Sequence, residues 1–561
     1  MMNNSNLYFN RSNSPRVARW LMSLAGCIAT ATLIQSCCEI SAASDAEALA
    51  GSNLDSCSAN HAQGQMSVVV SSKVARVSNG FLLETWNGAM KSFVNPKVLS
   101  LKSVDSATGD ADTVRFLQLD GKYGKGLGVG SRVLNTLFKE GGKGSGLLGS
   151  GTISNIQEAL EVKSPDINAT NRFKKISAFV GMEDFLSMQR PDGALSLYAN
   201  GYNASEQWAP AQTHYDTAFD DLKAAALAAN PTKTVRVAVL DTGIDINHPD
   251  LKDIIDRDLA YNALTGKAGA DHVGDQQGHG THVAGIIAGQ GKGKGAGAFT
   301  NVLGVAGKFN VKIVPIKVLG DDGTGSTAAM NRGIRWATQK NVDVISMSLG
   351  SGSNYDCLRD QGLKDPVIQE AIDKGIIVVA AAGNESCPLG GECETGGSKF
   401  KNYTVLPCAA ENVLCVASND FEEKASKFSN FKSATDGADA YRVTPDITAP
   451  GSRILSTYPI ISKFADYEGV AVLDGTSMAT PYVSGIAAIL KLTETADYPV
   501  NQKTLKIYLQ EASYKSDDYT TNFGVGRVDL KALVDNRKNK YINKNTGAAA
   551  PGARNTVPYT Y

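Results

Sequence analysis

The chain has 561 residues, of which 42% are hydrophobic and 20% charged, an ordinary globular composition with ample apolar residues for a core. Its 55 Lys and Arg residues nearly cancel its 56 Asp and Glu residues, which excludes a long-range field directed at nucleic acid or at an anionic membrane. We therefore expect a substrate recognised by local contacts and no nucleic-acid partner, and we expect a monomer.

A targeting segment is predicted at the start of the chain. Three arginines, Arg11, Arg16 and Arg19, precede an apolar run at 20–34. That run suits the core of a signal peptide and is short for a membrane span. The small residues of the sequence ISAA suit cleavage after Ala43, so we assign residues 1–43 to a signal peptide.

A second interpretation of the same segment is a lipid anchor. The sequence Ile34-Gln35-Ser36-Cys37 resembles a bacterial lipoprotein box, apart from Gln35, and Cys37 would then carry the lipid. The protein is thus expected to be secreted or extracytoplasmic. A lipid-anchored cell-envelope protein is the alternative.

The chain has nine cysteines, and five lie in its later part, at positions 357, 387, 393, 408 and 415. Export would bring them into an oxidising compartment, where disulfides are permitted. Cys387 and Cys393 are close enough in sequence to pair, as are Cys408 and Cys415, but sequence alone does not decide connectivity. No pair has CxxC spacing, which disfavours a zinc ribbon.

Residues 44–204 are predicted to form a smaller α+β domain that precedes the main one. The segment at 121–152 is glycine-rich and is expected to be a flexible loop around one short helix near 133–139. Strands are predicted at 67–70, 98–101 and 114–119, and the apolar spacing at 156–162 and 176–185 fits helix or strand.

After Pro231 the pattern changes to buried strands alternating with helices. Continuous apolar, β-branched runs predict strands at 235–240, 311–318, 342–347, 376–381 and 413–417. Helices are predicted between them at 280–289, 327–340 and 367–374. This alternation predicts an α/β domain with a doubly wound, mostly parallel sheet, whose functional residues gather at the carboxyl ends of the strands. We place this domain at 205–536 and a disordered Asn-, Lys- and Gly-rich tail at 537–561.

Asp241 directly follows the first of these strands, in the sequence Val239-Leu240-Asp241-Thr242-Gly243. A carboxylate at the end of a strand, beside a Thr-Gly turn, is placed to be held rigidly and partly buried. The alternative is an Asx-type turn or a helix cap, which are common for Asp after a strand.

Two histidines, His279 and His282, lie in the sequence GHGTHVAG at the start of a helix of small residues. His-x-x-His spacing suggests metal binding, but no Glu intervenes as in a zinc-protease helix and no Cys cluster is near. An imidazole at a helix start, flanked by glycines, suits a general base. His279 is therefore the candidate base, and His282 is expected to pack or to hydrogen-bond structurally.

Ser477 lies in the sequence DGTSMATP, followed by an apolar helix at 483–490. A serine at a helix N-terminus is commonly a cap, but the position also suits a nucleophile because N–H groups and the helix dipole favour a developing oxyanion. Asn384, in AAAGNE after a buried strand, could donate an amide hydrogen to that oxyanion, although Gly-Asn is also an ordinary turn.

Together and in this order, the four segments resemble those of the subtilisin-like serine proteases, the subtilases: VLDTGID, GHGTHVAG, AAAGNE and GTSMATP. The resemblance extends over about residues 205–535, with lesser matches such as VLGDDGTG, MSLG and GVGRVD. Tyr482 stands where the family usually has a histidine. The resemblance implies a serine endopeptidase with Asp241, His279 and Ser477 as its triad.

By the same resemblance, His279 acts as general base and acid, Asp241 fixes its tautomer, and Asn384 with the Ser477 N–H binds the oxyanion. No cofactor is required for this chemistry.

The resemblance also implies that substrate binds as an added strand between two segments, which are Ser348, Leu349 and Gly350 on one side and Gly323, Thr324 and Gly325 on the other. The primary specificity pocket would be lined by residues 380–383, with Ala382 and Gly383, and by 404–407. Here Val405 is expected to shorten the pocket and Glu385 to favour basic or polar residues. Asp275 is expected to contact the adjacent subsite.

Two further expectations follow from the resemblance. A structural calcium ion is expected, with Asp250 as one ligand, although the glycine-rich loop after the histidine helix lacks obvious carboxylates. The region before residue 205 is expected to be a propeptide that aids folding and inhibits the enzyme. Its alternative is a permanent N-terminal domain.

Two rival functions remain open at this point. The first is a non-catalytic binding protein on the same scaffold, which the intact catalytic positions disfavour. The second is another acyl-transfer enzyme, an esterase or a peptide ligase, and activity on peptide against ester substrates separates it from a protease.

Overall fold

The computed structural model describes residues 61–70, 101–106, 114–119 and 153–163, and then residues 207–546 apart from 293–301, 355–362, 396–397, 433–444, 461–468 and 515–525. The predicted signal peptide, Cys37, Cys357, the glycine-rich stretch with its short helix, the segment at 176–185 and the predicted boundary at 204 lie outside the described residues. The chain divides into two compact units, one of residues 1–59 and 67–156, the other of 60–66 and 157–561.

The first unit contains strands β2 (Leu101–Ser106) and β3 (Val114–Leu119), which pair antiparallel. Strands β1 (His61–Val70) and β4 (Ile153–Lys163) are divided between the two units. The strands predicted at 67–70 and 114–119 lie in β1 and β3. Of the strand predicted at 98–101, residues 98–100 lie outside the described residues, and Leu101 is the first residue of β2.

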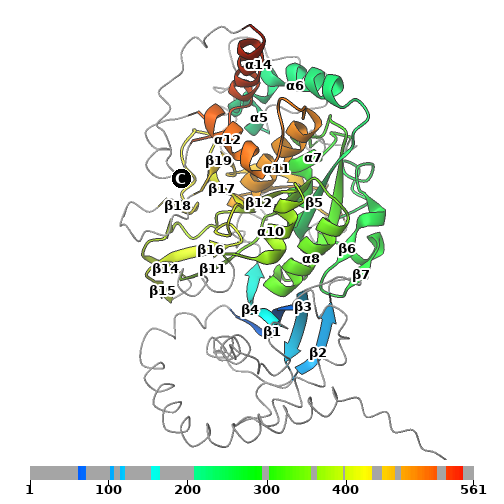
Figure 1. Cartoon of the computed structure of the whole chain (residues 1–561), viewed down its shortest axis with the longest axis vertical. Helices are drawn as coiled ribbons and strands as arrows, with labels where there is room; N and C mark the ends of the chain where they lie inside the picture. Colours follow the sequence, from blue (N-terminus) through cyan, green and yellow to red (C-terminus); the bar gives the residue numbers. More distant parts are fainter. Residues whose placement is uncertain are drawn as a thin grey trace, which may run out of the picture. The chain divides into compact units, whose positions relative to one another are not determined.

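The centre of the second unit is an eight-stranded sheet in the order β19-β17-β12-β10-β5-β8-β6-β7 (Figure 1). All neighbours pair in parallel except the edge strand β7, which is antiparallel to β6. This confirms the predicted mostly parallel α/β sheet. The strands are β5 (Val235–Asp241), β6 (Tyr261–Asn262), β7 (Lys267–Ala268), β8 (Val311–Lys317), β10 (Val344–Met347), β12 (Ile377–Ala381), β17 (Leu414–Asn419) and β19 (Ile447–Pro450).

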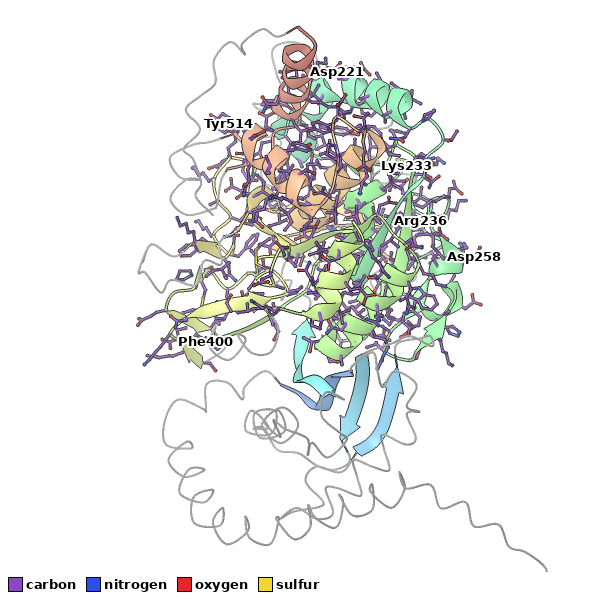
Figure 2. All side chains as sticks on the ribbon, viewed as in Figure 1. Asp221, Lys233, Arg236, Asp258, Phe400 and Tyr514 are labelled. Atoms are coloured by element: carbon purple, nitrogen blue, oxygen red, sulfur yellow. A yellow bond between two sulfur atoms is a disulfide. The ribbon has the colours of Figure 1, made fainter. Side chains whose placement is uncertain are left out.

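Helices cover both faces of this sheet, because alternate residues of a strand point to opposite sides. On one side, Val237 and Val239 of β5 share an apolar core with residues of α7 (His279–Ala288) and α11 (Thr476–Leu492). On the other, Leu240 lies beside Gly333 of α8 (Thr327–Gln339), which packs against α10 (Pro366–Asp373). Figure 2 shows that side chains fill the space between the sheet and its helices.

A second group of helices comprises α5 (Ala209–Gln212), α6 (Tyr215–Ala229), α12 (Gln502–Ala512) and α14 (Leu530–Thr546). The group packs against α11 through α6, which in turn contacts α5 and α14. Tyr482 of α11 contributes here, because its hydroxyl lies 2.6 Å from Thr213 Oγ1 between α5 and α6. Helix α14 runs past residue 536 into the predicted tail, since Leu530 and Leu533 are buried in the core and stabilise its first turns.

Short strands and turns complete the unit. Antiparallel pairs join β11 (Ser351–Asn354) to β16 (Tyr403–Leu406), β14 (Cys393–Thr395) to β15 (Ser398–Phe400) and β20 (Ile454–Thr457) to β21 (Val470–Leu473), while β13 (Pro388–Leu389) and β18 (Phe431–Lys432) pair in parallel. Two 3-10 turns span Arg257–Leu259 and Ala270–His272. Disulfides join Cys387 to Cys393 and Cys408 to Cys415, the pairs that sequence proximity allowed.

Strand β9 (Thr324–Ser326) contains part of the predicted substrate-binding edge. Within the second unit it pairs antiparallel with the end of β4, in the register Glu161 to Ser326, Val162 to Gly325 and Lys163 to Thr324. The backbone edge predicted for substrate is therefore paired with a strand from earlier in the same chain. Among the described residues, none of the helices combines the length and the apolar character needed to cross a membrane.

Candidate active site

The candidate catalytic residues converge at one edge of the central sheet. Strands β12, β10 and β5 are neighbours, and at their carboxyl ends lie Asn384, Ser348 and Asp241. Helices α7 and α11, which carry His279 and Ser477 in their first turns, pack against each other above that edge. Residues far apart in the sequence thus meet because the strands are parallel.

Asp241 and His279 form a buried pair. His279 Nδ1 lies 2.7 Å from Asp241 Oδ1, and both side chains are almost completely inaccessible to solvent. Thr242 N also donates to Asp241 Oδ1, at 2.7 Å. Gly280 permits this approach, because a Cβ there would lie 2.1 Å from Gly243 O. The pairing assigns the imidazole hydrogen to Nδ1 and leaves Nε2 as an acceptor.

The Asp275 carboxylate hydrogen-bonds both to Thr242, the residue after Asp241, and to residues on either side of His279. Its Oδ1 accepts hydrogen bonds from Thr242 Oγ1 at 2.9 Å and from Gly278 N at 2.7 Å. Its Oδ2 accepts from Thr281 N and Thr281 Oγ1, at 3.0 and 2.7 Å. Burial raises the pKa of the Asp275 carboxyl, while these hydrogen bonds oppose the rise. The geometry gives Asp275 a positioning role; its predicted contact with a substrate subsite stays a prediction.

Ser477 is held against the loop that follows β10. Its Oγ donates to Ser348 O at 3.2 Å, and Ser348 Oγ donates to Ser477 O at 2.8 Å. His279 Nε2 is buried and has no hydrogen-bond partner within the described part of the chain. The hydroxyl of Ser477 is therefore hydrogen-bonded to Ser348 O and not to His279 Nε2 in this structure.

Two N–H donors converge beside Ser477. Asn384 Nδ2 lies 3.2 Å, and Ser477 N 3.4 Å, from the position that a Cβ would take on Gly475. The Asn384 amide cannot flip freely, because its Oδ1 accepts from Thr476 N at 2.8 Å and from Thr476 Oγ1 at 2.9 Å. A fixed side-chain amide and a backbone N–H near a helix N-terminus make a site for an oxyanion.

His282 is a structural residue, as its predicted role requires. Its Nε2 lies 3.1 Å from both Ile454 O and Ala471 O, and the ring is fully buried. Burial lowers its pKa to about 3, with nearby His279 adding to the effect and the carbonyl hydrogen bonds opposing it. The ring is therefore neutral at physiological pH and ties α7 to strands β20 and β21.

The predicted substrate-binding residues fall into two places. Ser348, Leu349 and Gly350 follow β10, Ala382 and Gly383 follow β12, and the two segments are both joined to the first turn of α11. Gly323, Thr324 and Gly325 lie at β9, whose edge pairs with β4. The roles of these residues in binding substrate stay predictions.

Asp250 is buried, and both of its carboxylate oxygens are engaged by N–H donors of the described residues around it. Its carboxylate oxygens accept hydrogen bonds from the backbone N–H groups of Lys292 and Val302, the latter at 3.0 Å. Calcium takes six to eight oxygen ligands. Nearby, Gln290 Oε1 is buried without a hydrogen-bond partner among the described residues, but the ammonium of Lys308 lies 3.2 Å from Gln290 O.

More widely, the described ranges contain no group of three or more His, Cys, Asp or Glu residues able to hold a metal. Because residues 293–301 of this loop lie outside those ranges, the calcium ion stays a prediction.

Two positioning residues were not predicted from the sequence. Thr242 bridges Asp275 and the start of α7, because its Oγ1 accepts from Gly280 N at 3.0 Å and donates to Asp275. Thr476 fixes the Asn384 amide. Each of these threonines lies directly beside a predicted catalytic residue, and that adjacency could have suggested a role in the site. Their hydrogen-bond partners are distant in sequence, so the role itself could not be predicted.

The chain is similar to known serine proteases over the unit that contains this site. A family model described as the subtilase family matches residues 232–532, more than half of the chain. The major intracellular serine protease of Bacillus subtilis (strain 168) is 34% identical over 281 residues, 50% of this chain and 75% of that protein. Subtilisin DY of Bacillus licheniformis is 35% identical over 257 residues, covering 46% and 76%. Thermitase of Thermoactinomyces vulgaris is 31% identical over 336 residues, covering 59% and 97%.

Proposed function

Because this chain belongs to the subtilase family of serine endopeptidases, we propose that Asp241, His279 and Ser477 form its triad and that it is exported as a precursor that processes itself. The observation that carries the triad is the buried 2.7 Å contact between His279 Nδ1 and Asp241 Oδ1 beside the nucleophile loop. This contact leaves one ring nitrogen able to accept a proton.

The proposed reaction begins when Ser477 Oγ turns from Ser348 O toward His279 Nε2. Nε2 takes the hydroxyl proton as Oγ attacks the carbonyl carbon of a peptide bond. The imidazolium so formed is stabilised by Asp241, which keeps its own negative charge. His279 then returns the proton to the leaving amine, and water hydrolyses the acyl-enzyme by the same steps.

The negative charge of the tetrahedral intermediate would be bound by Asn384 Nδ2 and Ser477 N. Both donors are in place before substrate arrives, since Thr476 fixes the amide and α11 fixes the backbone N–H. Donors that need no reorganisation stabilise the transition state more than the neutral substrate carbonyl.

The N-terminal region is proposed to inhibit the enzyme until it is removed. The pairing of Val162 with Gly325 in β9 supports this, because it uses the backbone edge at which we expect substrate to add as a strand. A strand from the same chain at that edge competes with substrate at a high effective concentration.

Export is proposed from two features. The start of the chain has the charged, apolar and small-residue order of a signal peptide. The catalytic unit contains two disulfides, which persist in oxidising compartments. Secretion as a free enzyme is the first alternative to test, and lipidation at Cys37 is the second.

One comparison tests both the activity and the processing. Wild-type protein and Ser477→Ala are purified and incubated with a denatured protein substrate while their own masses are followed. We expect only the wild type to shorten and to cleave the substrate. A wild type that digests substrate at full length would overturn self-processing alone, whereas equal cleavage by the Ala variant would overturn the triad.

A further inference from the structure

The hairpin formed by β20 and β21 is hydrogen-bonded to α7, the helix that begins at His279. The His282 ring, as described above, bonds to a carbonyl group of each strand. In return, Ser456 Oγ donates to His282 O and Thr457 Oγ1 donates to Thr281 O, each at 2.7 Å. All four side chains are fully buried. These contacts fix the hairpin to the first turns of α7.

Tyr458 follows β20 and extends these contacts to the two residues before the histidine. Its hydroxyl donates to Gln277 O at 2.9 Å. Its ring lies against Gly278, since a Cβ at that position would be 2.2 Å from Tyr458 Cζ and 2.4 Å from Cε2. Glycine leaves room for the ring, and it also suits the φ of +102° at this position. The tyrosine is only 6% exposed, so it is packed firmly between the hairpin and this segment.

The main chain of Tyr458 is fixed from a direction other than α7. Its N–H donates to Gly469 O at 2.6 Å, which closes the loop between β20 and β21. The same carbonyl oxygen lies 2.7 Å from His248 Nε2. Because Asp250 N donates to His248 Nδ1 at 3.1 Å, the ring hydrogen is on Nε2 and is donated to Gly469 O. The position of Tyr458 is therefore set by buried contacts outside the catalytic helix.

The segment that Tyr458 contacts positions the backbone of His279. Gln277 Oε1 accepts a hydrogen bond from His279 N at 2.8 Å. Gln277 N and Gly278 N both donate to Asp275 Oδ1, at 3.1 and 2.7 Å. Residues 277 and 278 are thus held by two separate side chains, the carboxylate of Asp275 and the ring and hydroxyl of Tyr458. A displacement of this segment would move the imidazole away from its carboxylate partner.

We propose that Tyr458 is a positioning residue for His279, which it keeps in contact with Asp241 by holding the two residues before the histidine. The inference rests on the proposed triad, and it assigns Tyr458 an effect through the histidine rather than on the substrate. Misplacement of a catalytic group slows the chemical step, whereas the binding of substrate depends on other contacts. The expected signature is therefore a loss of kcat with little change in KM.

The kinetic test compares Tyr458→Phe, which removes the hydroxyl, with Tyr458→Ala, which also removes the ring. Both are measured on one peptide substrate beside the wild type, with all proteins compared as the same species by mass. Tyr458→Phe should lower kcat about three- to tenfold, because one hydrogen bond to the segment is lost. Tyr458→Ala should lower kcat by about 10–10²-fold, and KM should change less than about twofold in both variants.

A second measurement reports the contact between the histidine and the aspartate itself. In full-length Ser477→Ala protein, the hydrogen on His279 Nδ1 should give a proton NMR signal far downfield, because its hydrogen bond to the Asp241 carboxylate is short and charge-assisted. Adding Tyr458→Ala should shift this signal upfield, since the contact lengthens. An unchanged signal would overturn the positioning role, because a tyrosine that only adds stability would not move it.

The matched control is Tyr508 on α12, whose hydroxyl donates to Pro499 O at 3.2 Å and whose ring stacks on Tyr498 with centroids 4.1 Å apart. Tyr508→Phe and Tyr508→Ala lose equivalent contacts and should leave kcat and the NMR signal unchanged. An equal fall in kcat in these controls would overturn the inference, as would an unchanged kcat in the Tyr458 variants. If Tyr458→Ala does not fold, the kcat of Tyr458→Phe decides by itself. A wild type that cleaves neither peptide nor denatured protein would instead overturn the endopeptidase function, and this inference with it.

Discussion

Thr476 holds Asn384 through two hydrogen bonds, from its N at 2.8 Å and from its Oγ1 at 2.9 Å, both to Asn384 Oδ1. The residue before the nucleophile thereby orients the donor that is proposed to bind the oxyanion. The backbone bond depends only on the fold, whereas the hydroxyl bond can be removed by substitution. The contribution of this orientation to catalysis is therefore open to measurement.

Thr476→Val should lower kcat about tenfold with little change in KM, because the Asn384 amide loses one of its two anchors and Gly383 N loses its acceptor. Asn384→Ala should lower kcat more, by about 10²–10³, the size of the loss when such a donor is removed from a subtilisin. The matched control is Thr480→Val, since Thr480 Oγ1 is buried one turn later and bonds only to its own helix, at Thr476 O. A control as slow as Thr476→Val would show that the loss reflects α11 in general.

Asp275→Asn should lower both activity and stability. The carboxylate accepts from Thr242 beside Asp241 and from Thr281 in α7, so an amide NH2 placed among these donors leaves at least one of them unpaired. We expect unfolding to become easier by about 1–3 kcal/mol and kcat to fall while KM changes little. The free energy of unfolding is measured by urea titration, and kcat on a peptide substrate. Asp271→Asn, at an exposed position nearby, is the control; unchanged kcat in Asp275→Asn would refute the positioning role.

His282 should make the enzyme less stable in acid. Its folded pKa is about 3 against the usual 6.5, so between these values the unfolded chain binds a proton that the folded chain does not. The free energy of unfolding should then fall by about 1.4 kcal/mol for each pH unit on descending from 6.5 to 3, and the contribution should be complete above 6.5.

The variant His282→Gln keeps a donor for the carbonyl groups but removes the titration. It should flatten the dependence of the unfolding free energy on pH in this window, while the control His272→Gln, at an exposed position, should leave it unchanged. The measurement is thermal or urea unfolding in a pH series with Ser477→Ala as background, which prevents self-digestion. An unchanged slope in His282→Gln would contradict the assignment.

The sequence was sufficient to predict the parallel sheet and the candidate triad, because their signals are local. The buried runs at β5, β10 and β12 need only their own residues to be recognised, and Asp241, His279 and Ser477 each lie next to a turn or helix start. The predictions that failed or were missing depend on distant contacts. Helix α14 continues into the predicted tail because Leu530 and Leu533 pack into a core built elsewhere.

The same limit applies within the site. The positioning role of Asp275 was not predicted, because its partner Thr242 lies 33 positions earlier, beyond any local pattern. Val405 is a second example, because only the fold brings its two methyl groups near Gly350 and Gly383, which come from different loops. Its predicted effect on the specificity pocket stays a prediction.

The loop after α7 could be stabilised at Asp250 either by hydrogen bonds alone or by the predicted calcium ion, and substitution of Asp250 distinguishes the two. In the structure the carboxylate accepts N–H groups of Lys292 and Val302, which needs no ion. On that basis a calcium chelator should leave the melting temperature of the Ser477→Ala protein unchanged. Asp250→Asn should lower its stability by about 1–3 kcal/mol, because the amide can no longer accept from both donors, and the loss should be the same with and without the chelator. A wild-type Asp250 protein that is destabilised by the chelator, together with an Asn variant that is not, would instead establish a calcium ion at this residue.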